Sequence, residues 1–286
     1  MSEASLDDSQ PVATGASAPI GVFDSGIGGL TVARELMQQL PNESIVYVGD
    51  TARVPYGPKS PDTVRRYSRE IAAYLLDQGV KLVVIACNTA TAHALAALTA
   101  ELPVPVLGVV SPGARAAVAV DGAGSARPRR VGVIGTVGTV RSGAYERAIH
   151  ALAPDAEVVA RACPLFVPFV EEGWLDHPAT RLVAHEYLDP VRREGIDTLV
   201  LGCTHYPLLK PLVADVVGPA VRLIDSAQET AAETGRMLAD AGLRAPPGTV
   251  PRHRFIVTDA ADQFSRTAAH FLGAPLEHVE TLALAC

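Results

Sequence analysis

Two cysteines occupy matching places in this sequence. Cys87 ends the apolar run 81–87, and Cys203 ends the apolar run 198–203. Each is followed by a helix-like segment, whose unpaired N–H groups and dipole favour a negative charge at its start. Such a setting increases the thiolate fraction of a cysteine. A single free cysteine could equally be a buried core residue, but two at matching places indicate thiol chemistry.

The residues that follow the two cysteines differ. The first thiol precedes Asn88 and Thr89, and the second precedes Thr204 and His205. An imidazole beside a thiol can exchange a proton with it, so His205 is the candidate partner of the second thiol. Asp24, at an earlier strand–loop junction, is the candidate partner of the first, although it could also cap a helix.

Two thiols with separate proton partners fit acid–base catalysis by two bases. If the two cysteines face each other across a cleft, one thiolate removes a proton from a substrate carbon. The other thiol then delivers a proton to the opposite face of that carbon, and the stereocentre is inverted. The two thiols would titrate as a coupled pair, with one protonated and one not in each direction.

The surroundings of the two cysteines also repeat. Aligning Ile20 with Val131 gives an offset of 111 residues, and aligning the two cysteines gives 116. The first alignment also pairs the hydroxyl residues Ser25 and Thr136. A near-constant offset predicts an internal duplication of about 110–116 residues. Any doubly wound protein repeats apolar strands, which is the simpler alternative, but the matched cysteines favour duplication.

The elements that would position these residues are short apolar strands separated by helix-like segments. The strands are rich in Val and Ile and do not alternate with polar residues, as expected for parallel strands covered on both faces. We therefore predict an α/β fold of two similar doubly wound domains, each with a mostly parallel central sheet. The two domains are expected to be related by a pseudo-twofold axis, with the active site in the cleft between them. A loop or linker is expected at 121–130. The predicted strands are 20–24, 44–50, 81–87, 105–110, 130–136, 156–163, 198–203 and 221–226.

The composition excludes several classes of protein. The net charge of −7 argues against the basic face that a nucleic-acid-binding protein normally needs, so no direct nucleic-acid binding is expected. No apolar run approaches the roughly 18 residues of a membrane span. The acidic segment 1–18 is expected to be a disordered leader, because it lacks the apolar core of a signal peptide. Four cysteines without an export signal indicate free thiols in a reducing cytoplasm.

The sequence contains no clear cofactor motif. It has no CxxC pair, so no metal site is expected. The glycines of 131–140 do not form a GxGxxG pattern, and no phosphate-binding loop is present. Of the three lysines, Lys59, Lys81 and Lys210, none is an evident Schiff-base lysine. We therefore expect a reaction without any cofactor.

At these same residues the chain resembles the aspartate/glutamate racemase family. The matching motifs run in order over nearly all of residues 18–227, and the DSGIGG and PYG elements are similar to the glutamate branch. They are FDSGIGGL (23–30), VPYGPKS (54–60), ACNTATA (86–92), GVVSPGA (108–114), VGVIGT (131–136), LGCTHYPLL (201–209) and LIDSA (223–227).

The resemblance implies cofactor-independent interconversion of L- and D-glutamate, which supplies D-glutamate for peptidoglycan. It implies an isomerase, a cytoplasmic location and a homodimer. It also implies that the second domain is inserted in the first. The first domain would comprise 19–112 and 226–286, and the second would comprise 113–225.

The family's functional residues can be carried over by motif. The catalytic residues would be Cys87, Cys203, Asp24 and His205. The substrate site would contain no Arg or Lys, so hydroxyls, amides and helix N-termini would have to hold both substrate carboxylates. The implied substrate-binding residues are Asp24, Ser25, Tyr56, Gly57, Asn88, Thr89, Thr136, Glu171, Thr204 and His205.

Two other functions remain open from the sequence. The same thiol pair could act on aspartate or another carboxylic acid. Alternatively, both thiols could be structural in a ligand-binding or regulatory module, because the fold alone does not fix the function.

Overall fold

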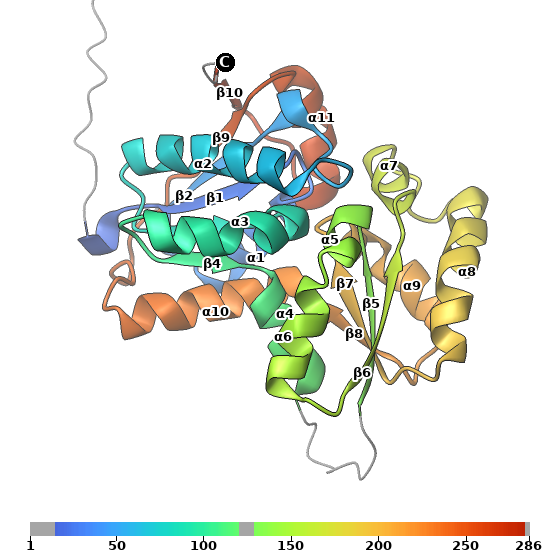
Figure 1. The fold of residues 1–286 in the computed structure, drawn as a ribbon. Helices are drawn as coiled ribbons and strands as arrows, with labels where there is room; N and C mark the ends of the chain where they lie inside the picture. The colour runs from blue at the N-terminus through green and yellow to red at the C-terminus, as the bar shows by residue number, and fades with distance from the viewer. Residues whose placement is uncertain (1–14, 120–128, 284–286) are drawn as a thin grey trace, which may run out of the picture.

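A computed structural model describes residues 15–119 and 129–283, which form two α/β domains side by side (Figure 1). Each domain is built around a parallel sheet. The first sheet has the order β10-β9-β2-β1-β3-β4, and the second has the order β6-β5-β7-β8. The first sheet comprises β1 (Ile20–Asp24), β2 (Ile45–Gly49), β3 (Leu82–Ile85), β4 (Val106–Gly108), β9 (Arg254–Val257) and β10 (Glu280–Thr281). The second comprises β5 (Arg130–Gly135), β6 (Glu157–Ala162), β7 (Thr198–Gly202) and β8 (Arg222–Asp225).

Helices cover both faces of each sheet (Figure 1). In the first domain, α2 and α3 pack on one face, and α1, α10 and α11 pack on the other. In the second, α4 and α6 lie opposite α8 and α9. The helices are α1 (Leu30–Gln39), α2 (Pro61–Asp77), α3 (Asn88–Glu101), α4 (Val110–Val118), α5 (Val137–Arg141), α6 (Ala144–Leu152), α7 (Phe166–Glu171), α8 (Pro178–Arg193), α9 (Lys210–Val217), α10 (Ser226–Asp240) and α11 (Ala261–Leu272), with 3₁₀ turns η1 (Gly15–Ser17), η2 (Thr51–Arg53) and η3 (Tyr206–Leu209).

The burial of the strands explains why their sequences are apolar without alternation. Successive side chains of a strand point to opposite faces of the sheet. In β1, Ile20 and Val22 enter the core beneath α1, whereas Phe23 enters the core beneath α2 and α3. All three side chains are inaccessible to solvent. The prediction of parallel strands covered on both faces is therefore confirmed.

The two sheets repeat the same local topology. In the first sheet β1 lies between β2 and β3, followed by β4, and in the second β5 lies between β6 and β7, followed by β8. Ile20, the first residue of β1, pairs with Leu82 of β3, and Val131 in β5 pairs with Thr198 of β7. The predicted pair of similar domains is thus confirmed at the level of strand order.

The C-terminal segment returns to the first domain. β9 pairs with β2, and β10 extends the same sheet, while α10 packs against α1. Helix α4 contacts both α6 and α10, so it joins the two domains. The boundaries 112/113 and 225/226 remain a prediction. Most of the linker expected at 121–130 lies outside the described residues, and its last residue, Arg130, already belongs to β5.

Two expectations need correction. The leader was predicted to be disordered through residue 18, but Gly15–Ser17 form η1 and Ala18 is buried. The ammonium group of Lys81, which is paired with the buried carboxylate of Glu43, donates to the carbonyl of Ala16 at 2.6 Å and fixes this turn. Residues 1–14 lie outside the described residues. The strand predicted at 105–110 is shorter, because helix α4 already begins at Val110.

Among the described residues no helix combines the length and the apolar character that a bilayer span requires.

Candidate active site

A small cavity of about 60 Å³ lies between the two domains. Its wall is formed by residues that follow the carboxyl ends of β1, β2, β3, β5, β6 and β7, where ligands of open parallel sheets bind. No Lys or Arg takes part. The lining residues are Ser25, Gly26, Ile27, Val54, Pro55, Tyr56, Gly57, Cys87, Asn88, Thr89, Thr136, Val167, Glu171, Cys203, Thr204 and His205.

The cavity thus brings together every residue assigned to the site from the sequence except Asp24. Sequence reasoning missed the apolar part of the wall, which is formed by Ile27, Val54, Pro55 and Val167. Ile27 and Pro55 lie inside the motifs DSGIGG and VPYG, so those motifs could have signalled them. Nothing in the sequence around Val167 distinguishes it from an ordinary helix residue.

Cys87 lies in the wall contributed by the first domain, directly before α3. Its Sγ accepts a hydrogen bond from the backbone N–H of Ala90 at 3.4 Å, so the thiol caps the helix. It also lies 3.6 Å from the hydroxyl oxygen of Ser25, to which it donates. Burial raises the pKa of Cys87 to about 12, the negative charge of Asp24 adds to this increase, and the contacts with Ala90 and Ser25 oppose it. The thiol is therefore protonated at neutral pH.

Cys203 lies in the wall contributed by the second domain, directly after β7. Its Sγ is 3.8 Å from Nδ1 of His205, and Nε2 of the same ring is 2.9 Å from Oε1 of Glu171. Burial by itself lowers the pKa of His205, but the hydrogen bonds and negative charges of Cys203 and Glu171 outweigh it and raise the pKa to about 10. The imidazole is therefore protonated at neutral pH. The protonated ring thus lies beside Sγ of Cys203.

Asp24 lies behind the wall of the cavity. The residue is fully buried at the end of β1, and its Oδ2 accepts the backbone N–H of Gly26 at 3.0 Å. Burial raises the pKa of this carboxyl, while the charge of His205 and nearby backbone N–H groups oppose the increase. Asp24 therefore interacts electrostatically with the partners of both thiols, and the expected substrate contact has no support in the lining of the cavity. It does not cap α1, whose N-cap is Gly29.

Gly28 allows the loop after β1 to approach the second domain closely. A Cβ atom at this position would lie 2.4 Å from Nδ1 of His205 and 2.4 Å from Oγ1 of Thr204. Any side chain here would collide with the groups beside Cys203. The hydroxyl of Thr31, in α1, donates to the carbonyl of Thr204 at 3.0 Å and holds the same two segments together.

Hydroxyl and amide groups form the polar wall between the thiols. The hydroxyls of Thr89 and Thr136 are 2.9 Å apart, and each also contacts the hydroxyl of Thr139. Asn88 accepts a hydrogen bond from the hydroxyl of Tyr145 at 2.7 Å. These contacts connect the start of α3 in the first domain with α5 and α6 in the second.

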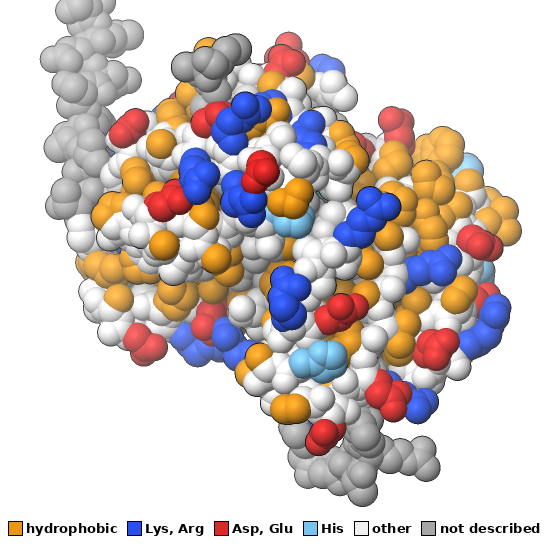
Figure 2. Space-filling view, viewed as in Figure 1, with side chains coloured by type: hydrophobic (Ala, Val, Ile, Leu, Met, Phe, Trp, Pro, Cys, Tyr) orange, Lys and Arg blue, Asp and Glu red, His pale blue; other side chains and the backbone are white. Residues whose placement is uncertain are grey.

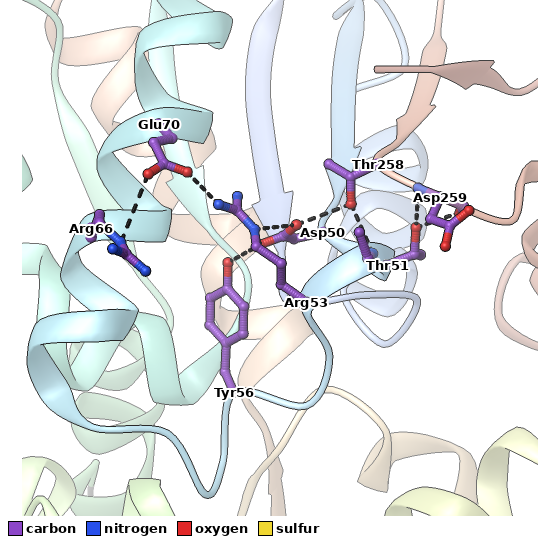
Figure 3. A network of polar contacts seen from close by, with 9 residues as sticks. Asp50, Thr51, Arg53, Tyr56, Arg66, Glu70, Thr258 and Asp259 are labelled. Carbon is purple, nitrogen blue, oxygen red and sulfur yellow. Dashed lines mark hydrogen bonds and ion pairs between the residues drawn. The ribbon is translucent and has the colours of Figure 1, made fainter. Parts of the chain in front are cut away.

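The segment 50–57 contributes Tyr56 and Gly57 to the wall of the cavity. The hydroxyl of Tyr56 donates to the carboxylate of Asp50, a buried residue (Figure 3). The same carboxylate binds Nε of Arg53 at 2.8 Å and the hydroxyl of Thr258 at 3.0 Å. The hydroxyl of Tyr56 therefore takes part in the polar contacts that hold this segment.

The surface around the site carries mixed charge. On the face drawn in Figure 2, Lys and Arg side chains are interspersed with Asp and Glu over both domains. Within the described part of the chain, no group of three or more His, Cys, Asp or Glu side chains could hold a metal ion. Cys163 is buried outside the cavity, and Cys286 lies outside the described residues.

Comparison with known proteins matches this architecture. A glutamate racemase of Geobacter metallireducens is 52% identical over 93% of this chain and 96% of its own length. The structure of a glutamate racemase from Bacillus anthracis superposes with a TM-score of 0.88 at 44% identity, covering 93% of this chain and 97% of that one. A glutamate racemase from Francisella tularensis in complex with D-glutamate superposes with a TM-score of 0.86 at 38% identity, covering 94% and 98%.

The description of the Asp/Glu/hydantoin racemase family matches residues 20–234, which include both cysteines of the cavity. The match covers most of the chain, and the similar proteins named above are matched over nearly their whole length. This chain therefore belongs to the Asp/Glu/hydantoin racemase family and is an isomerase.

Proposed function

We propose that this protein interconverts L- and D-glutamate without a cofactor, by proton transfer between the substrate α-carbon and two cysteines. The observation that carries the proposal is the position of Cys87 and Cys203. Both thiols follow corresponding strands of two similar sheets, and both line one cavity of about 60 Å³. A substrate held between them would present opposite faces of its α-carbon to the two sulfur atoms.

The electrostatics of the two thiols support a starting state in which they differ. In the proposed reaction Cys203, which lies beside the protonated His205, acts as the base. Cys87 is the thiol and acts as the acid. The proton of the α-carbon goes to Sγ of Cys203, the carbon is left as a planar carbanion, and the proton of Cys87 is delivered to its other face. The enzyme then holds a thiolate at Cys87 and a thiol at Cys203, which is the starting state for the reverse direction.

The new thiolate at Cys87 has its own stabilising groups. The backbone N–H of Ala90 already points at the sulfur, and the dipole of α3 favours a negative charge at this place. Ser25 can reverse its hydrogen bond and donate to the thiolate, because a hydroxyl both donates and accepts.

Neutral donors would bind the two substrate carboxylates. The polar wall offers the side chains of Asn88, Thr89, Thr136 and Thr204, together with the N-terminal N–H groups of α3. The same preorganised donors would stabilise the negative charge that develops on the α-carboxylate during the transfer. The Francisella tularensis relative in complex with D-glutamate supports glutamate as the ligand.

The biological setting follows from the family resemblance. We propose that the D-glutamate formed supplies peptidoglycan synthesis, that the protein works in the cytoplasm, and that it forms a homodimer. Racemisation of aspartate or another dicarboxylate by the same thiols is the second candidate, because no Lys or Arg among the described residues lines the cavity and fixes the length of the side chain.

Incubation with L-glutamate in deuterated water tests the proposal. We expect the optical rotation to decay to zero and deuterium to appear at the α-carbon. In early turnover deuterium should accumulate in D-glutamate while the remaining L-glutamate keeps its proton, because different bases remove and deliver the proton. Exchange of aspartate but not glutamate would establish the second candidate. Exchange of neither substrate would contradict the proposed reaction.

A further inference from the structure

Asn88 carries an unpaired donor at the wall of the cavity. The residue opens α3 and is 2% exposed. Its Oδ1 accepts the hydrogen bond from Tyr145, whereas its Nδ2 is buried and has no hydrogen-bond partner within the described part of the chain. A buried polar group normally has a partner, and an exception calls for an explanation. Because Asn88 lines the cavity, a ligand in the cavity is the partner that would satisfy this donor.

The orientation of the amide decides which ligand it can bind. The oxygen and nitrogen of an asparagine exchange places when the amide rotates by half a turn. With Nδ2 toward the cavity, Asn88 offers two N–H donors to an anion. With Oδ1 toward the cavity, it would offer lone pairs that repel a carboxylate.

Tyr145 is held rigidly by its surroundings. It lies in α6 of the second domain, is 3% exposed, and its ring packs against the backbone at Gly113 and Gly202. A Cβ atom at Gly202 would lie 3.0 Å from this ring. The hydroxyl of Tyr145 therefore has a fixed position, 2.7 Å from Oδ1 of Asn88.

We infer that Tyr145 is a positioning residue, which donates to Oδ1 of Asn88 from the opposite domain and thereby directs Nδ2 toward a substrate carboxylate. The inference rests on the proposed function, because the carboxylate is that of the proposed substrate. It adds a residue that does not line the cavity and lies in none of the motifs that carry the family resemblance. It also gives the two domains a shared part in binding, since the donor on one is oriented by the other.

The variant Tyr145→Phe tests this role, because it removes one hydroxyl and leaves the ring. Without that hydroxyl the amide is no longer preorganised, and we expect KM for glutamate to rise about three- to tenfold. The turnover number should stay within about twofold, because the amide is equally useful to the bound substrate and to the transition state. In the background Asn88→Ala, the additional change Tyr145→Phe should leave KM unchanged.

Tyr206→Phe is the matched control. Its hydroxyl is equally buried and donates to the carbonyl of Cys163 at 2.7 Å, but the residue does not line the cavity. This variant should lose similar stability in a thermal melt and keep the wild-type KM. An equal rise of KM in the control would show that Tyr145 acts only through stability.

Four further outcomes complete the test. An unchanged KM in Tyr145→Phe would overturn the inference, and so would effects that multiply in the double variant. If wild-type protein fails to exchange glutamate, the proposed function falls instead. If Tyr145→Phe does not fold, ¹H–¹⁵N spectra of the wild-type protein replace the kinetic test. The side-chain amide signal of Asn88 is assigned as the one that is absent from the spectrum of Asn88→Ala. That signal should shift on addition of D-glutamate, and a signal that does not move would overturn the inference.

Discussion

Cys87 and Cys203 occupy corresponding positions in the two domains, but different kinds of group surround their sulfur atoms. Cys87 contacts a backbone N–H and a hydroxyl, both neutral, and the charge of Asp24 raises the pKa of its thiol. Cys203 faces the protonated ring of His205, which Glu171 holds from its other side. The repeated topology thus supplies two corresponding positions, and in the proposed reaction the different neighbours make one thiol the acid and the other the base.

The difference has a consequence for the ligand-free protein. Two identical thiols in identical surroundings would be protonated to the same extent, and the protein would be a mixture of protonation states. The protonated ring of His205 lies beside only one of the two sulfur atoms, and this difference removes the degeneracy in the proposed reaction. The following predictions test this comparison, from the largest expected effect to the smallest.

Removal of either sulfur should have the largest effect. In Cys87→Ser or Cys203→Ser the hydroxyl is far less acidic than a thiol, and we expect the rate of racemisation to fall about 10³-fold or more. The measurement is the decay of optical rotation with each enantiomer. Cys163→Ser, which replaces a buried thiol outside the cavity, is the control and should remain active. Near-normal turnover in either active-site variant would end the two-base interpretation.

Replacement of the cation should have the next largest effect. In His205→Asn the thiolate of Cys203 loses its counter-charge, and we expect kcat/KM to fall about 10²-fold. The equilibrium constant of a racemisation is one, so kcat/KM must fall equally in both directions. The asymmetry should appear in the isotope effect measured with α-deuterated substrate. This effect should grow for the enantiomer whose proton Cys203 removes, and equal growth for both enantiomers would contradict the assignment.

Removal of the Glu171 carboxylate, which contacts the ring of His205, should lower the rate of racemisation about tenfold. In wild-type protein the rate should decline as the pH rises through about 10, because the pKa of His205 is raised and the ring is protonated only below it. Glu171→Gln removes one of the negative charges that raise this pKa. The alkaline limb of the pH–rate profile should therefore move to lower pH, with a loss of roughly tenfold near neutrality. The limb belongs to the coupled pair of His205 and Cys203. An unmoved limb would show that Glu171 has no influence on the ring.

Removal of the Ser25 hydroxyl, which contacts Cys87, should have the smallest effect on kcat. Its contact with the thiol is long, at 3.6 Å, and a neutral hydrogen bond contributes about 0.5–1.5 kcal/mol. Ser25→Ala should therefore lower kcat by roughly two- to tenfold, as measured in the same assay. A loss as large as that of His205→Asn would remove the contrast between a neutral and a charged partner.

Much of this arrangement could be predicted from short stretches of sequence. The strands are apolar because both faces of each sheet are covered, and that pattern is local. The cysteines could be paired because the sequence itself repeats around them. Most site residues lie within a few positions of these strand ends, so the motifs that identify the strands also identify the site.

The remainder depends on contacts between distant residues. Asp50 binds Thr258, which lies 208 positions further along the chain, and Tyr145 meets Asn88 across 57 positions. No local pattern reports such a contact. The placement of Asp24 behind the wall depends on the path of the backbone between Asp24 and Gly29, which the sequence motif alone does not determine.

The size of the cavity sets a limit on how the protein can turn over. The cavity measures about 60 Å³, and residues of both domains form its wall. A relative movement of the two domains would widen the cavity, and it would break the hydrogen bond between Thr89 of the first domain and Thr136 of the second. We predict that this movement is a step of each catalytic cycle. When that step is slow, turnover will decrease in a viscous solvent even though the chemistry at the sulfur atoms is unchanged.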